Sequence, residues 1–140
     1  MSRTTLSGSC LCGAVTYEAT GEPGRFYHCH CSRCRKATGT GHASNLFLQP
    51  GSLTWLTGRD QVREFKVPGA KRFTNQFCGI CGGRLPRQPE GSDTVLIPAG
   101  SLDSEAPIQP QARIFIDSRA GWSCSGDAIA AYPGYAPSQA

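Results

Sequence analysis

The chain has 140 residues, which fits one domain and leaves no room for a second sizeable core. Its formal net charge of +4 is too small to indicate a charge-driven disordered chain. So small an excess of positive charge says little about nucleic-acid binding. The 17 glycines and 10 prolines predict many turns around a small core. Such a core needs cross-links, either disulfides or bound metal ions, and the 8 cysteines are the evident candidates.

The first nine residues are polar and lack the apolar stretch of a signal peptide. No run approaches the roughly 18 apolar residues of a membrane span. We therefore expect a cytoplasmic protein that does not contact a membrane. In that compartment C-x-C and C-x-x-C clusters bind metal more often than they form disulfides, so we expect metal staples.

Short elements are predicted from the first cysteine pair onward. Residues 13–20 alternate small or apolar with polar side chains, which predicts a strand, and residues 21–24 (GEPG) predict a turn. Residues 26–31 are expected to be extended. Residues 32–38 predict one or two helical turns, with the first serine as the N-cap and the glycine after the segment as the terminator.

Further strands are predicted between glycine and proline signals, at residues 43–48, 53–56, 62–67, 71–77, 94–97 and 113–116. No helical periodicity persists beyond about ten residues, so the predicted fold class is mainly β, with at most one or two short helical segments. Residues 1–131 form the single predicted domain, and residues 132–140 a loose C-terminal tail.

Seven cysteines fall into three clusters, which are Cys10 with Cys12, Cys29 with Cys31 and Cys34, and Cys78 with Cys81. In an extended strand, residues two apart point to one face about 6.6 Å apart, so a C-x-C pair can converge on one ion. The C-x-x-C pair instead needs a tight turn, which the glycines around it supply.

The C-x-x-C knuckle and one C-x-C pair complete a four-sulfur site, which is closed and structural. The middle cluster holds a second metal by itself and leaves a position open for water or a thiol. Counting alone also permits one site on Cys10, Cys12, Cys29 and Cys31 and another on Cys34, Cys78, Cys81 and Cys124. We favour the first grouping because the second separates Cys34 from its neighbours.

Three motifs in order, S-G-S-C-L-C-G-A-V-x-Y, C-H-C-S-x-C-R-K-x-x-G and F-C-x-x-C-G, resemble the glutathione-dependent formaldehyde-activating enzyme family, which is related to centromere protein V. Residues 110–122 (PQARIFIDSRAGW) resemble its late motif, so the resemblance covers roughly residues 7–125. The chain departs from the pattern at Arg113, where the family commonly has histidine, and at Cys124, which the pattern lacks.

The resemblance implies a β-tent fold, a zinc-stapled arrangement of stacked, mostly antiparallel short sheets. It also implies two zinc ions per chain. The structural zinc would be held by Cys10, Cys12, Cys78 and Cys81. The second zinc would be held by Cys29, Cys31 and Cys34.

Each histidine near the clusters has two interpretations. His28 and His30 flank Cys29, so along a strand they face away from its sulfur, and we expect surface imidazoles or imidazoles behind the ligands. His42 is the candidate acid–base group near the open zinc, against a solvated histidine. Cys124 is expected to be an inert thiol and not a fourth ligand.

The basic residues Arg33, Arg35 and Lys36 lie beside the three-cysteine cluster. They either pair with carboxylates of an anionic thiol such as glutathione or form a solvated face that offsets thiolate charge. Trp55 and Trp122 are expected in the core.

The leading hypothesis is a zinc-dependent carbon–sulfur lyase-like enzyme, similar to S-hydroxymethylglutathione synthase. Glutathione or a similar thiol would occupy the open position of the second zinc and add to a small aldehyde such as formaldehyde, or the reverse reaction would release the aldehyde. The alternative is a non-catalytic zinc module that binds a protein or thiol ligand. Nucleic-acid binding ranks last, because the basic residues lack interleaved aromatic residues and a long basic stripe.

Overall fold

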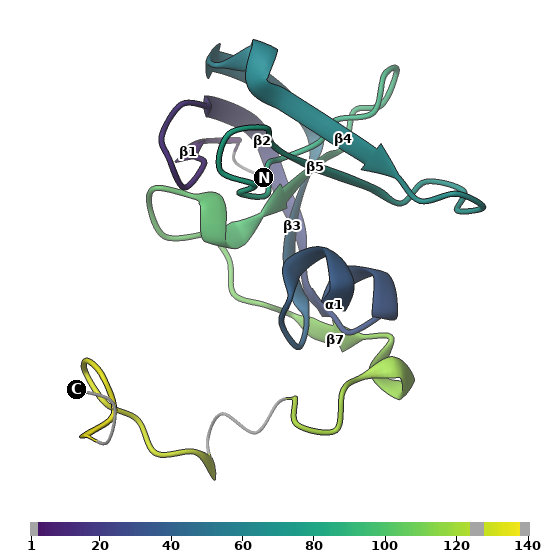
Figure 1. Cartoon of the computed structure of the whole chain (residues 1–140). Helices are drawn as coiled ribbons and strands as arrows, with labels where there is room; N and C mark the ends of the chain where they lie inside the picture. Colours follow the sequence, from purple (N-terminus) through teal and green to yellow (C-terminus); the bar gives the residue numbers. More distant parts are fainter. Residues whose placement is uncertain (1–2, 124–127, 138–140) are drawn as a thin grey trace.

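The structure of the chain is a computed structural model that describes residues 3–123 and 128–137 (Figure 1). Within those residues the protein is mainly β, as the sequence predicts, with seven strands, one α-helix and three short 3₁₀ turns. In chain order the elements are β1 (Thr4–Ser9), β2 (Thr16–Cys29), α1 (Ser32–Thr38), β3 (Ala43–Thr57), η1 (Arg59–Gln61), β4 (Val62–Lys66), β5 (Thr74–Cys78), β6 (Val95–Pro98), η2 (Ala99–Ser101), β7 (Ala112–Ile114) and η3 (Ile116–Ser118).

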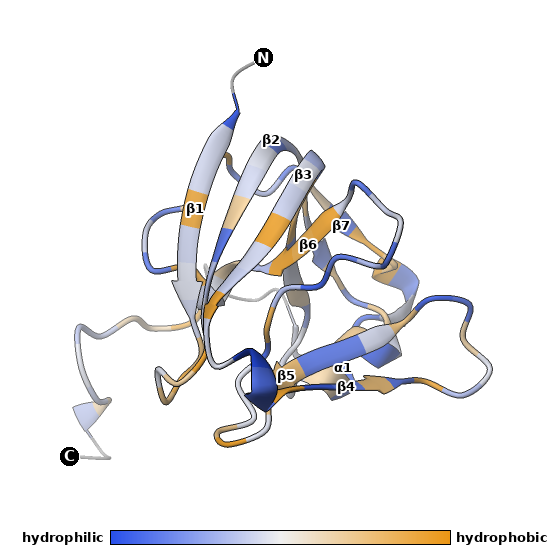
Figure 2. Ribbon diagram, turned by 90° about the horizontal axis from the view of Figure 1, so that it is seen from above, coloured by the Kyte–Doolittle hydropathy of each residue, from blue (hydrophilic) through white to orange (hydrophobic). Residues whose placement is uncertain are grey.

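The larger sheet is built around the long antiparallel pair of β2 and β3. The first half of β2 pairs with β1, and its last residues pair with β7, the one parallel neighbour in this sheet as described. On the far side of β3 lies β6. Strands β4 and β5 form a separate two-stranded antiparallel sheet, which Figure 2 shows apart from the first. The arrangement of small, mostly antiparallel sheets is therefore confirmed.

A continuous strand replaces the turn predicted at residues 21–24. β2 runs through this segment with register shifts between Gly21 and Arg25, and β3 likewise joins the two strands predicted at residues 43–48 and 53–56. The two backbones approach closely here, because a Cβ on Gly21 would collide with the backbone of Pro50 and Gly51. Glycine and proline thus produce β-bulges that bend the sheet without reversing the chain.

The main hydrophobic core packs on one face of the large sheet. Eight buried side chains form it, namely Leu6, Tyr17, Ala19, Phe26, Leu46, Leu48, Val95 and Ile97. Their alternation along β2 and β3 gives the two-residue period expected of a half-buried strand. Strand β1, which the sequence analysis did not predict, contributes only Leu6 to this core, so its hydrophobic signal is weak.

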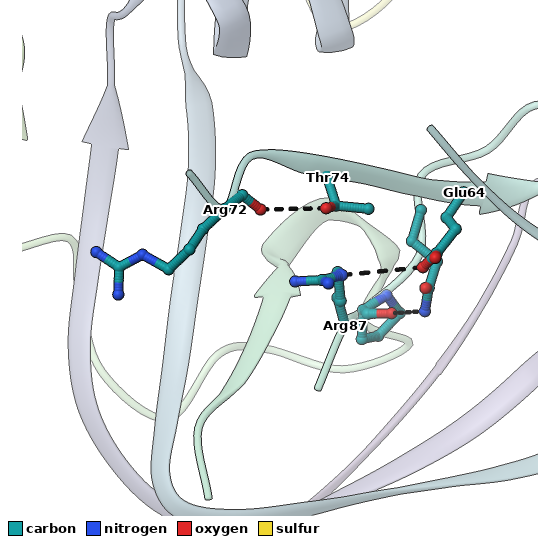
Figure 3. A network of polar contacts seen from close by, with 6 residues as sticks. Glu64, Arg72, Thr74 and Arg87 are labelled. Carbon is teal, nitrogen blue, oxygen red and sulfur yellow. Dashed lines mark hydrogen bonds and ion pairs between the residues drawn. The ribbon is translucent and has the colours of Figure 1, made fainter. Parts of the chain in front are cut away.

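Residues 84–87 tie the two sheets together. Arg84 bridges to Phe77 of β5, and Arg87 exchanges two backbone hydrogen bonds of 2.9 Å with Leu96 of β6. Figure 3 shows the polar contacts of this region, in which Arg87 Nε lies 4.0 Å from a carboxylate oxygen of Glu64 on β4. The segment that follows the Cys78–Cys81 knuckle is therefore held in position by both sheets.

The C-terminal part leaves the sheets after η3. Residues 131–135 are exposed, and Figure 1 shows the described tail extending away from the rest of the chain. The predicted boundary at residue 131 stays a prediction. Among the described residues no helix is long and apolar enough to cross a membrane.

Candidate metal centres and the adjoining cavity

Four cysteine sulfurs meet between the turn after β1 and the knuckle after β5. The Sγ atoms of Cys10, Cys12, Cys78 and Cys81 all lie within 4.8 Å of one another. The Cys10–Cys12 and Cys12–Cys78 sulfur distances are 3.7 Å and 4.0 Å. Four sulfurs placed tetrahedrally at about 2.3 Å from zinc are separated by about 3.8 Å, so this donor set fits zinc in both geometry and chemistry.

Two backbone turns face each other at this cluster. Cys10 and Cys12 lie in a tight turn and not in the extended strand expected from their spacing, because the Gly13 N–H donates to the Cys10 carbonyl at 3.1 Å and Gly13 has φ 81°. Opposite them, the Gly82 N–H donates to the Cys78 carbonyl at 2.8 Å, with Gly82 at φ 76°. In both turns glycine supplies a left-handed conformation that other residues rarely adopt.

Backbone amides point at the sulfurs of this cluster. The Val15 N–H donates to Cys10 Sγ at 3.3 Å, and the Gly83 N–H donates to Cys81 Sγ at 3.4 Å. The Gly83 amide, followed by that of Cys12, lowers the pKa of Cys81 to about 6. These amides therefore favour the thiolate form of Cys81.

Three further sulfurs meet where β2 passes into α1. Cys29 ends β2, Cys31 precedes the helix and Cys34 lies in its first turn, and their Sγ atoms also lie within 4.8 Å of one another. This set fits a metal held by three thiolates with a fourth position for an exogenous ligand. The structure thus brings together the two sets of sulfurs that the cysteine spacing favours. The alternative grouping, which places Cys34 with Cys78 and Cys81, would separate sulfurs that lie together.

The helix start differs from the prediction. Cys31, not Ser32, is the N-cap, because Cys31 has an extended backbone (φ −65°, ψ 157°) and its Sγ accepts the Cys34 N–H at 3.3 Å. The predicted terminator is confirmed, since Gly39 has φ 71° and its N–H donates to the Arg35 carbonyl at 2.7 Å. The sulfur at the N-cap therefore serves both the helix and the metal set.

The three-cysteine cluster is more deeply buried than the first. Cys29 and Cys34 pack with Ala43 under cover of Phe73, from the segment that precedes β5, and of Ile114 in β7. Burial raises the pKa of the Cys34 thiol, and the neighbouring Cys29 raises it further. A metal ion or another positive charge is therefore needed to hold all three sulfurs as thiolates at neutral pH.

A cavity of about 660 Å³ adjoins both clusters. It is lined by Cys10 of the first cluster and by Ala43, which packs against the second. The sulfurs of the second cluster are not among its described lining. His42 and Arg84 contribute its nitrogen-bearing side chains, and Asp103 contributes a carboxylate that accepts a hydrogen bond from Ser9.

The three histidines gather beside this cavity. The rings of His28 and His42 stack with centroids 3.9 Å apart, and the ring of His30 lies 5.2 Å from that of His42. His30 is wholly buried, and its Nδ1 lies 3.3 Å from Ser123 Oγ, so a surface position for it is excluded. Burial first, and then the neighbouring His42, lower the pKa of both His28 and His30. Among the described residues, no histidine joins either sulfur set.

The basic residues predicted to bind substrate are not gathered in the cavity. Arg33 and Lys36 are exposed on α1, and Arg35 is half-buried. Arg113, at the departure from the family pattern, is exposed in β7. The sequence analysis missed Arg84, and the available signal was a charged residue three positions after Cys81, immediately behind the knuckle glycines.

The two tryptophans have different environments. Trp55 is partly buried and packs against both the main core and the core beside the first cluster, as predicted. The prediction for Trp122 is wrong, since it is 67% exposed at the edge of the described chain. Cys124 lies outside the described residues.

Comparisons with known proteins agree with this architecture. A crystal structure of a Rhodobacter sphaeroides protein is similar with a TM-score of 0.50 and 20% sequence identity, covering 77% of this chain and 99% of that chain. At this identity the likeness shows a shared fold. No protein in the curated set matches the sequence significantly. Residues 5–118 match the family described as glutathione-dependent formaldehyde-activating enzyme. Because this match spans most of the chain, the protein belongs to that family.

Proposed function

We propose that the protein is a zinc-dependent carbon–sulfur lyase-like enzyme that adds glutathione or a similar thiol to a small aldehyde such as formaldehyde, or catalyses the reverse reaction. The observation that carries the proposal is the pairing of a closed four-sulfur set with a three-sulfur set in a member of this family. Reduced cysteines and a reduced thiol substrate both suit the cytoplasm, which is the proposed location.

The residues divide into structural and reactive groups in this proposal. Cys10, Cys12, Cys78 and Cys81 would hold a structural zinc, and Cys29, Cys31 and Cys34 would hold the second zinc. Bound there, zinc supplies the positive charge that favours the thiolate form of an incoming thiol. Three protein thiolates, and not four, leave one coordination position for that thiol.

Proton transfer falls to His42 in this mechanism. The thiol loses its proton, its sulfur forms a bond to the aldehyde carbon, and the carbonyl oxygen becomes the hydroxyl of a hemithioacetal. His42 lines the cavity, and its Nδ1 lies 3.5 Å from Ser44 Oγ, so the proton would move at Nε2. The stacked ring of His28 holds the plane of the His42 imidazole.

The test is exchange spectroscopy with isotopically labelled formaldehyde and glutathione. Metal-replete protein is expected to accelerate exchange between free aldehyde and the hemithioacetal, and Cys31→Ser is expected to abolish the acceleration. Arg33→Gln, which alters an exposed residue of the same helix, serves as the matched control and should behave like wild type. Thiol binding without acceleration would contradict the enzyme and favour the non-catalytic zinc module.

A further inference from the structure

Arg84 is held in an unusual position for an arginine. It lies on the cavity wall, immediately after the knuckle glycines, and bridges to Phe77 of β5. Its Nε donates to Asn75 Oδ1 at 3.0 Å. The side chain is thus anchored through Nε, which leaves the two terminal nitrogens of the planar guanidinium for other acceptors.

Within the described residues, no carboxylate lies within 4.0 Å of the Arg84 guanidinium. Among residues 3–123 and 128–137, the ion pair within 4.0 Å is the one between Arg87 and Glu64, and Arg84 takes no part in it. Asp103, the carboxylate on the same cavity wall, accepts from Ser9. The Nη1 atom of Arg84 is buried and has no hydrogen-bond partner within the described chain.

The thiols of the second cluster act on Arg84 electrostatically. Burial lowers the pKa of its guanidinium, whereas the nearby Cys34, Cys29 and Cys31 raise it as thiolates. Arg84 therefore lines the cavity and also lies near enough to the three-sulfur set for its charge to act on the guanidinium. A zinc ion bound to those sulfurs would cancel two of their three negative charges, so the guanidinium would be less fully balanced and could attract another anion.

We propose that Arg84 binds a carboxylate group of the substrate in this cavity. The inference rests on the proposed function and identifies the residue that gives it specificity for an acidic reactant. Arg84 lines the cavity, and its buried Nη1 lacks a hydrogen-bond partner, so the guanidinium retains a charged donor for a carboxylate. The volume of about 660 Å³ lies within the range of small-molecule sites, roughly 300–1,000 Å³.

Arg84 is a stronger candidate for binding the carboxylate than the exposed basic residues of α1. The exposed side chains of Arg33 and Lys36 would bind an anion in competition with water and salt, which weakens such pairs. Arg84 is partly buried and already desolvated, so an acceptor gains more from binding it.

Titration calorimetry on metal-replete protein tests the proposal. The ligands are S-methylglutathione, which keeps its carboxylates but has no free thiol, and its diethyl ester, which lacks the carboxylate charges. We expect wild type to bind the acid at least about tenfold more tightly than the ester, as befits hydrogen bonds to a charged group. Arg84→Gln should remove this preference, and Arg33→Gln should keep it.

A second variant covers the case in which Arg84→Gln fails to fold. Asn75→Ala removes the partner of Arg84 Nε and leaves the charge in place, so it should reduce the preference for the acid without loss of metal. An unchanged preference in Asn75→Ala and Arg84→Gln would overturn the proposal. So would an equal loss of acid and ester binding accompanied by loss of the second zinc, which would make Arg84 a charge-balancing residue for the thiolates.

A carboxylate could come from the thiol or from an acidic aldehyde such as glyoxylate. Loss of S-methylglutathione affinity alone in Arg84→Gln would assign the position to the thiol, and loss of glyoxylate affinity alone would assign it to the aldehyde. Failure of both to bind wild type would overturn the proposal. Because neither measurement depends on turnover, acid preference without catalysed exchange would contradict only the proposed function, and catalysed exchange without acid preference only the role of Arg84.

Discussion

The phenol of Tyr17 is completely buried in the main core, and its hydroxyl lies 2.6 Å from Ser101 Oγ. Burial raises its pKa from the ordinary 10.0 of a tyrosine to about 12. Above pH 10.0 the unfolded chain therefore loses this proton before the folded chain does, so the free energy of unfolding should decline as pH rises from 10.0 towards 12.

Ultraviolet titration combined with denaturant unfolding measures both effects. Tyr17 should ionise late, towards pH 12, and Tyr17→Phe should flatten the alkaline decline in stability. Ionisation of all the tyrosines together in the folded protein would show that Tyr17 is not protected from water.

At the scale of single residues, the sequence predicted which residues carry the chemistry better than it predicted the environment of each side chain. The close spacing of the cysteines predicts which sulfurs meet, because a loop of a few residues limits where they can go. Zinc ligation itself stays a prediction. The position of Arg84 depends on packing between β5 and β6, and the burial of His30 depends on Ser123, so neither could be read from local sequence.

Among the elements, the bulged pair of β2 and β3 gives a sharp test of backbone approach. Gly21→Ala places a Cβ against the backbone of Pro50 and Gly51, so it should destabilise the fold by about 1–3 kcal/mol, as overpacking typically does. Gly24→Ala is the matched control on the same strand, because a Cβ there meets nothing within 4 Å.

Denaturant unfolding of both variants provides the measurement. Equal stability of the two variants would contradict the close approach of the β2 and β3 backbones.

The same close approach explains why the predicted turn at residues 21–24 was wrong. A Gly-Glu-Pro-Gly sequence is typical of a turn, and only its pairing with another Pro-Gly segment across the sheet makes it a bulge.

For the whole molecule, the two sulfur sets should contribute differently to stability. The first set joins residues 10–12 to residues 78–81, which are far apart in sequence, so its binding energy is largely folding energy. The second closes only six residues and gains little from loop closure. Cys81→Ser is expected to unfold or aggregate the protein, whereas Cys34→Ser should leave it largely folded.

Thermal unfolding of metal-replete variants distinguishes the two roles. An equal loss of thermal stability in Cys81→Ser and Cys34→Ser would count against this division. It would indicate that Phe73 and Ile114, which pack on the second cluster from distant segments, make that cluster equally important for folding.

The mainly β class was predictable because composition and periodicity excluded long helices. The joining of the two sheets through residues 84–87 was not, because no local pattern reports it.

A thiol should be able to occupy the fourth coordination position of the second metal. Cobalt-substituted protein, titrated with glutathione, tests it most directly, because cobalt–thiolate bonds give a charge-transfer absorption that changes when another thiolate binds. We expect two cobalt ions per chain and a change on adding glutathione that is lost in Cys31→Ser. Two bound cobalt ions with no spectral response to thiol would contradict the account, since the fourth position would then already be filled from within the protein.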